Sequence, residues 1–221
     1  MKKAIIFGST GLTGAALLQQ LLENSGYQQV NRFLRTPDSL AREKLITIIT
    51  DFTDLDAHAN TFSEADVFCC LGTTIAKVNF DKEAFKQADL YRPMQIAEAA
   101  KKFGANQFII ISALGANKNS SIFYNRVKGE LEEQLKQLQL PAVHIMHPSL
   151  LLGERREKRK GEGIAKVLTT LFRPLMFGPL KKARPILASD VAKAMIRIAE
   201  KNNTGYHIYP SDQLQEIADA K

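Results

Sequence analysis

Short apolar runs alternate with segments of helical periodicity along most of this chain. Six runs are predicted to be β-strands, because they are short and end at polar residues, glycine or proline: residues 4–7, 30–35, 45–50, 66–71, 107–112 and 142–146. Apolar positions at helical spacing predict a helix that begins near residue 15, helices over 81–103 and 121–138, and a shorter turn within 53–61. This alternation predicts an α/β fold, a doubly wound parallel sheet with helices on both faces.

The alternation weakens beyond Pro148. We expect a helix over 163–176, a proline-rich joint through Pro185, a helix over 189–201 capped by Ser189 or Asp190, a strand near 206–208 and a last helix. The chain of 221 residues is then one domain. Residues 1–150 form its cofactor-binding core, and residues 151–221 form a small C-terminal extension that walls the substrate side.

Three glycines lie in the turn between the first strand and the first helix, at Gly8, Gly11 and Gly14. Glycine permits a tight turn, lets the backbone approach a phosphate and lets the helix pack close to the strand. The N–H groups and the positive dipole end of the new helix would face the ligand, so the turn predicts a pyrophosphate site. The alternative is a glycine-rich turn that binds nothing.

The end of the second strand indicates which dinucleotide binds. NAD sites usually place an acidic residue there, whereas NADP sites place an arginine that pairs with the 2′-phosphate. This chain has Arg35, with Arg32 nearby and no acid on that strand. We therefore predict NADP(H), with two exposed surface charges as the alternative.

Tyr124 and Lys128 are four residues apart and so share one face of a helix. A nearby lysine favours the phenolate of a tyrosine and prepares it for acid–base chemistry. Ser112, at the end of the fifth strand, could hydrogen-bond a substrate carbonyl. The alternative for the pair is an aromatic core contact beside a surface lysine.

Composition changes this picture little. The net charge of +7 comes largely from residues 154–160 and 181–184, where no aromatic side chain interleaves the charges. Nucleic-acid binding is therefore disfavoured, and we expect the first basic segment to cover the active site. No stretch predicts a membrane span or a secretion signal, so we expect a cytoplasmic protein. Cys69 and Cys70 are expected to be buried thiols, and no metal-ligand spacing is present among cysteines or histidines.

These residues resemble the short-chain dehydrogenase/reductase family, and the segments around Cys69, Ser112 and Tyr124 resemble its atypical Tat-interacting protein members. The resemblance implies an NADPH-binding Rossmann domain with Ser112, Tyr124 and Lys128 as the catalytic set. It further implies that the cofactor contacts Gly8, Ser9, Thr10, Gly11, Leu12, Gly14, Arg35, Asp51, Phe52, Leu71, Gly72, Thr73, Tyr124, Lys128, Pro148 and Ser149. Relatives often carry a second serine where this chain has Ala113, which would weaken catalysis.

Two functions follow from this reasoning. The first is an NADPH-dependent oxidoreductase that transfers hydride to a small carbonyl substrate. The second is a non-catalytic regulatory or redox-sensing protein that binds NADPH and acts through a protein partner. Substrate identity and oligomeric state, monomer or homodimer, stay open.

Overall fold

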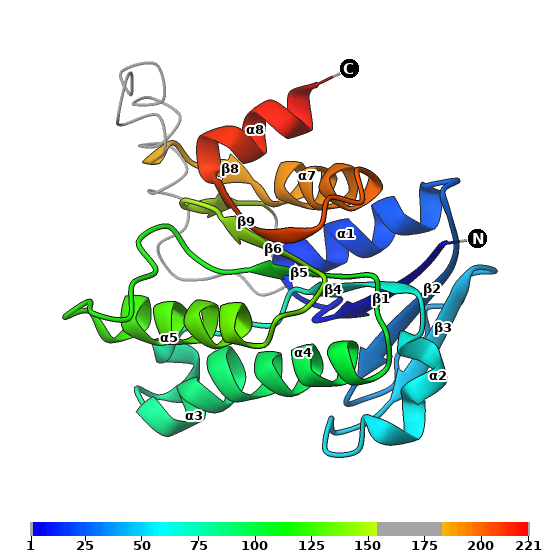
Figure 1. Cartoon of the computed structure of the whole chain (residues 1–221), viewed down its shortest axis with the longest axis horizontal. Helices are drawn as coiled ribbons and strands as arrows, with labels where there is room; N and C mark the ends of the chain where they lie inside the picture. The colour runs from blue at the N-terminus through cyan, green and yellow to red at the C-terminus, as the bar shows by residue number, and fades with distance from the viewer. Residues whose placement is uncertain (1, 154–182, 221) are drawn as a thin grey trace.

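All strands of the main sheet run parallel, in the order β3-β2-β1-β4-β5-β6-β9 (Figure 1). The computed structural model describes residues 2–153 and 183–220. The strands of this sheet are β1 (Lys2–Phe7), β2 (Tyr27–Leu34), β3 (Leu45–Ile49), β4 (Ala65–Cys69), β5 (Gln107–Ile111), β6 (Ala142–His147) and β9 (Gly205–Pro210). A small second sheet pairs β7 (Leu151–Leu152) with β8 (Ile186–Leu187), also in parallel.

Helices cover both faces of the main sheet, as Figure 1 shows. One layer holds α1 (Leu12–Glu23), α7 (Ala188–Glu200) and α8 (Ser211–Asp219). The other holds α3 (Lys82–Lys86), α4 (Arg92–Lys102) and α5 (Phe123–Gln137), with α2 (Ala59–Phe62) beside them. Short turns η1 (Asp56–His58), η2 (Ile75–Val78) and the π-helical η3 (Gln87–Tyr91) complete the described elements.

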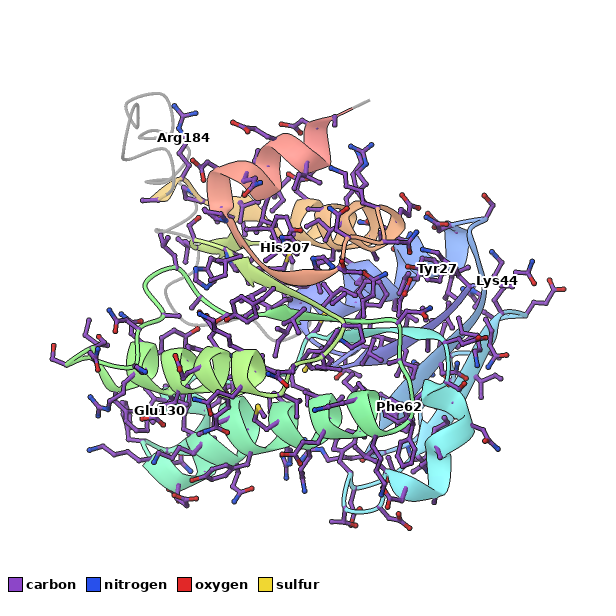
Figure 2. The ribbon with its side chains drawn as sticks, viewed as in Figure 1. Tyr27, Lys44, Phe62, Glu130, Arg184 and His207 are labelled. Carbon is purple, nitrogen blue, oxygen red and sulfur yellow. The ribbon has the colours of Figure 1, made fainter. Side chains whose placement is uncertain are left out.

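Each central strand is apolar on both faces, because successive side chains point to opposite sides of the sheet. On β1, Ile5 and Phe7 pack toward α4 and α5, whereas Ala4 and Ile6 pack toward α1 and α7. Side chains fill the space between the sheet and each helix layer in Figure 2, where the labelled Phe62 is one of the fully buried residues. The α/β doubly wound sheet predicted from the sequence is therefore confirmed.

The segment predicted as one helix over residues 81–103 consists of α3, η3 and α4. Asp81 begins it, since its carboxylate accepts hydrogen bonds from two backbone N–H groups of the first turn. Pro93 explains the interruption: it has no N–H to donate to the carbonyl of Asp89, four residues earlier. The backbone shifts to π-helical spacing at that point, and this shift places Asp89 in the site described below.

The predicted cap of the helix near residue 189 is wrong. The helix α7 begins at Ala188, and its N-cap residue is Leu187, which makes no side-chain capping hydrogen bond. The physical reason is that β8 runs directly into the helix, so the chain enters it from an extended strand. The predicted strand near 206–208 and the last helix are present as β9 and α8.

The described part of the C-terminal extension belongs to the sheet and its helix layers. β9 pairs with β6 along the main sheet, and α7 packs against α1. The predicted helix over 163–176 and the basic segment 154–160 lie outside the described residues. Among the helices that the structure does describe, none combines the length and apolar character needed to cross a membrane.

Candidate functional site

The parallel strands bring most of the predicted site residues to one edge of the sheet. Gly8 follows β1, Arg35 follows β2, Leu71 follows β4, Ser112 follows β5 and Pro148 follows β6. Because every one of these strands ends at the same edge, residues far apart in the sequence meet there. This edge is where ligands of open α/β sheets bind.

The glycine turn is packed too closely for side chains. A β-carbon on Gly14 would lie 2.0 Å from the carbonyl oxygen of Gly8, and one on Gly8, which has a φ of 83°, would lie 2.6 Å from the carbonyl oxygen of Cys70. These contacts hold α1 against the ends of β1 and β4. Gly11 caps the helix and is exposed with Thr10, while Leu12 is half-buried.

Ser9 gives an independent indication of a ligand at this turn. Its hydroxyl is buried and has no hydrogen-bond partner within the described structure. Buried polar groups normally have a partner, so this hydroxyl is suited to a ligand oxygen. Together with the closely packed glycines and the free N–H groups at the start of α1, it fits the pyrophosphate of a dinucleotide.

The two arginines of β2 have different environments. Arg32 is buried, and its guanidinium is paired with Asp38 and donates to Thr47 across the sheet. Arg35 is exposed just past the end of β2. Arg32 therefore stabilises the β2–β3 connection, whereas the charge of Arg35 is open to solvent.

The residues after β3 form a tight turn. Asp51 is exposed, and its carboxylate accepts hydrogen bonds from the N–H and hydroxyl of Thr53, which hold the pKa of Asp51 below its usual value. Phe52 has a φ of 70°, and its ring is buried 5.8 Å from that of Phe7. The ring of Phe52 therefore belongs to the hydrophobic core.

An ion pair lies at the centre of the site. Lys128 of α5 and Asp89 of η3 are 2.7 Å apart, and their side chains are 4% and 1% exposed. The other carboxylate oxygen of Asp89 accepts a 2.7 Å hydrogen bond from the N–H of Thr73, after β4. Gly72 lies beside the pair, since a β-carbon there would be 3.4 Å from Asp89 and 3.9 Å from Lys128.

Tyr124 lies one helical turn before Lys128 on α5, the helix that Glu130 marks in Figure 2. Its ring is 5.7 Å from that of Phe85. Burial raises the pKa of Tyr124 above its usual value, Lys128 opposes the rise and Asp89 adds to it. Burial also acts to lower the pKa of Lys128, but Asp89 and then Tyr124 raise it above the usual value. The phenol is thus neutral and the ammonium charged.

Ser112 makes a contact that the sequence did not suggest. Its hydroxyl is buried and donates to the carboxylate of Glu132, one turn beyond Lys128 on α5. The same carboxylate oxygen is 2.8 Å from Nε2 of His147 at the end of β6. The structure therefore brings Tyr124, Lys128, Gly72 and Thr73 together, and it engages Ser112 in a neighbouring cluster.

The residues after β6 serve mainly as structural links. Pro148 is buried, and its carbonyl accepts a hydrogen bond of 3.1 Å from the N–H of Leu114. The hydroxyl of Ser149 donates to the carbonyl of Arg184 and accepts from Ser211. These contacts join the β6 end to the loop after β5 and to the C-terminal extension.

Sequence reasoning missed Asp89 and Glu132. Glu132 could have been found, because it continues the four-residue spacing of Tyr124 and Lys128 along one helix face. Asp89 had no comparable signal, since a helix without interruption would have given it a different orientation. Its position depends on the π-helical turn before Pro93.

The remaining candidates are structural. Cys69 is a buried free thiol, as expected, whereas Cys70 is only half-buried, and burial raises the pKa of Cys69 to about 12. His144 stacks on His207, with ring centroids 5.3 Å apart. Within residues 2–153 and 183–220, no group of three or more His, Cys, Asp or Glu side chains could hold a metal ion.

Comparisons with known proteins indicate which kind of ligand this chain binds. Residues 8–159 match the family model described as NAD(P)H-binding. Protein HTATIP2 from Rattus norvegicus is 35% identical over 169 residues, which cover 75% of this chain and 69% of the relative. The mitochondrial protein FMP52 from Debaryomyces hansenii is 34% identical over 203 residues, with coverage of 90% and 88%.

Solved structures share the fold at lower identity. MoeE5 in complex with UDP-glucose and NAD has a TM-score of 0.69 and 16% identity, over 94% of this chain and 75% of the other. UDP-N-acetylglucosamine 4-epimerase from Methanobrevibacter ruminantium has a TM-score of 0.70 and 18% identity, over the same shares. The predicted Rossmann fold and nicotinamide cofactor are thereby confirmed.

The expected cytoplasmic location is corrected by the same comparisons. Relatives from Debaryomyces hansenii, Scheffersomyces stipitis and Aspergillus niger, which are 31% to 34% identical to this chain, are named as mitochondrial proteins. The expectation rested on the lack of a recognisable targeting segment in the sequence, and that lack does not determine location.

Proposed function

Because this chain belongs to the NAD(P)H-binding family, we propose that it is an NADPH-dependent oxidoreductase that reduces a small carbonyl substrate. The observation that carries the proposal is the placement of Tyr124 and Lys128 on one face of α5, next to Gly72 and Thr73 at the end of β4. The proposal thus assigns a proton donor and a positive charge to the edge of the sheet where ligands of open α/β sheets bind.

When bound, the reduced nicotinamide supplies a hydride. Tyr124, as a neutral phenol, donates the proton that the carbonyl oxygen needs as its negative charge develops. Lys128 lies one turn away and stabilises the phenolate that remains. Arg35 binds the 2′-phosphate, and the start of α1 with Ser9 binds the pyrophosphate. Asp51, Leu71, Gly72, Thr73, Pro148 and Ser149 line the path between them.

The experiment is an assay of NADPH oxidation by the full chain with a panel of ketones, aldehydes and nucleotide sugars. We expect turnover in the wild type, none in Tyr124→Phe, and unchanged cofactor binding in that variant. Full activity in Tyr124→Phe would refute the assignment of the proton donor. Tyr91→Phe, a change at an exposed tyrosine on η3, is the matched control.

A second candidate is an NADPH-binding regulatory protein without turnover, acting through a protein partner. The hydrogen bond from Ser112 to Glu132 favours it, because it engages the hydroxyl that would polarise a carbonyl. Absence of turnover across the panel, with tight NADPH binding retained, would support this candidate over the enzyme.

A further inference from the structure

The ion pair between Asp89 and Lys128 brings a second charge into the proposed site. The pair joins two helix segments across the interior, and its side chains are almost fully excluded from water. A lysine that stabilises a phenolate needs its positive charge free to act on the phenol. Here a carboxylate 2.7 Å away offsets part of that charge.

Asp89 is held in this position from two sides. The N–H of Thr73 donates to one of its oxygens at 2.7 Å, and Lys128 contacts the other. Its backbone lies in the π-helical turn that Pro93 imposes, and such turns are frequent at functional sites. Asp89 therefore cannot easily move away from Lys128 while the fold is intact.

We propose that Asp89 is a positioning residue that offsets the charge of Lys128 and thereby acts together with burial to keep Tyr124 as a neutral phenol, the form that donates a proton. The charged and titratable groups that act on Tyr124 are Lys128 on the same helix and Asp89 on η3. Cys69 on β4 acts on Lys128 in turn. The inference deepens the proposed function and rests on it for its consequence in turnover.

The neutral form of Tyr124 suits carbonyl reduction better than the reverse oxidation. In carbonyl reduction, the carbon of the substrate receives a hydride from the reduced nicotinamide, and its oxygen receives the proton of Tyr124. A C–H bond of the nicotinamide, the C=O π bond and the phenol O–H bond break, while a C–H and an O–H bond form on the substrate and the nicotinamide is left oxidised. Tyr124 is left as a phenolate, which takes a proton from water. The reverse oxidation needs the phenolate at the start, so Asp89 favours the form that reduces.

The test is the pH titration of Tyr124, read from the ultraviolet absorbance of tyrosinate. The chain has five tyrosines, so the signal of Tyr124 is the difference between each protein and the same protein carrying Tyr124→Phe. In Asp89→Asn, which keeps the shape and removes the charge, we expect the Tyr124 transition at lower pH, by about one unit or more. A transition at the wild-type pH or above it would overturn the proposal.

A second comparison covers the case in which Asp89→Asn alone does not fold. The double variant Asp89→Asn with Lys128→Met removes both charges, an exchange that buried pairs often tolerate. Its Tyr124 transition should lie below that of Lys128→Met alone, in which Asp89 acts without a counter-charge. Equal transitions would overturn the proposal. Asp66→Asn is the control, because this buried carboxylate contacts Tyr27 at the opposite edge of the sheet.

The absorbance measurement requires neither substrate nor cofactor, so it separates the two proposals. A shifted transition in a protein without turnover would support the action of Asp89 and overturn the reductase. Turnover with an unshifted Tyr124 transition would support the reductase and overturn the action of Asp89. If both hold, the alkaline limit of carbonyl reduction in Asp89→Asn should move to lower pH together with the Tyr124 transition.

Discussion

The hydroxyl of Ser112 donates a hydrogen bond to Glu132, and the two residues are only 4% and 8% exposed. A hydroxyl has one proton to donate, so Ser112 can meet any further ligand only as an acceptor while this bond is intact. The carboxylate of Glu132 also contacts His147. The backbone carbonyl of Glu132 accepts a hydrogen bond from the hydroxyl of Tyr206. Glu132 thus joins α5 to the ends of β5 and β6 and to β9.

We first predict that Glu132→Ala destabilises the protein. It leaves the buried Ser112 hydroxyl and the half-buried His147 ring without their partner, and the unpaired hydroxyl alone should cost about 1–3 kcal/mol. Glu132→Gln keeps an acceptor and should cost less. Urea denaturation measures both, and Glu133→Ala, at the neighbouring position facing Lys118, should leave the free energy of unfolding unchanged. Equal losses at 132 and 133 would contradict this account.

Ser112→Ala should affect turnover far less than Tyr124→Phe. Since the serine proton is committed to Glu132, its removal costs a substrate little polarisation, and we expect less than about a tenfold fall in kcat. Loss of the proton donor at Tyr124 should cost about 100-fold or more. Steady-state kinetics on one carbonyl substrate compare the two. Equal losses would show that Ser112 releases Glu132 during the reaction.

Charge reversal at Arg35 should remove the preference for NADPH. Arg35→Glu places a carboxylate where we expect the 2′-phosphate, so NADPH affinity should fall roughly 10- to 100-fold, the worth of one charge-assisted hydrogen bond. NADH affinity should change little. Arg42→Glu makes the same charge change on the exposed β2–β3 connection, and it should leave the ratio of NADPH affinity to NADH affinity unchanged. Fluorescence titration of each variant with both cofactors measures this ratio. A parallel loss in both variants would indicate long-range charge effects instead.

The sequence predicted the sheet because its central strands are buried on both faces and read as uninterrupted apolar runs, as in Ile5, Ile6 and Phe7. The glycine turn was equally predictable from the sequence, since close backbone contact restricts the residue type at Gly8 and Gly14. These are local properties, and local pattern determines them.

The less predictable features depend on contacts between distant segments. Arg32 and Arg35 look alike in sequence, yet Asp38 folds back onto the first and leaves the second exposed. The prediction of a single helix over 81–103 missed the π-helical turn that orients Asp89 toward Lys128. The hydrogen bond of Ser112 likewise depends on which helix face packs against the end of β5.

Gly14→Ala should weaken cofactor binding. The added β-carbon would lie 2.0 Å from the carbonyl oxygen of Gly8, which belongs to the backbone and cannot rotate away. The start of α1 must then move, and its N–H groups lose their alignment with the pyrophosphate, so NADPH affinity should fall by more than about tenfold. Gly104→Ala is the control. Gly104 has a φ of 72°, which strains alanine, but an added β-carbon there would meet no other atom within 4 Å. The free energy of unfolding should therefore fall while the affinity for NADPH is unchanged.

The last prediction concerns acid stability and follows from His144. This imidazole is fully buried, lies 3.0 Å from the hydroxyl of Tyr209 and stacks on His207. Burial first, and then the charge of His207, lower its pKa from 6.5 to about 4. The folded protein keeps the ring neutral, whereas the unfolded chain binds a proton below about pH 6.5.

Between these two pKa values the unfolded state binds more protons, so the free energy of unfolding should fall as pH decreases, by at most about 1.4 kcal/mol per pH unit from this group. Urea denaturation at several pH values from about 6.5 down to about 4 measures the slope. His144→Asn should flatten it, since asparagine does not titrate, whatever it changes in absolute stability. His58→Gln, at a half-buried histidine beside Phe33, should retain the slope. An undiminished slope in His144→Asn would assign the acid sensitivity to other groups.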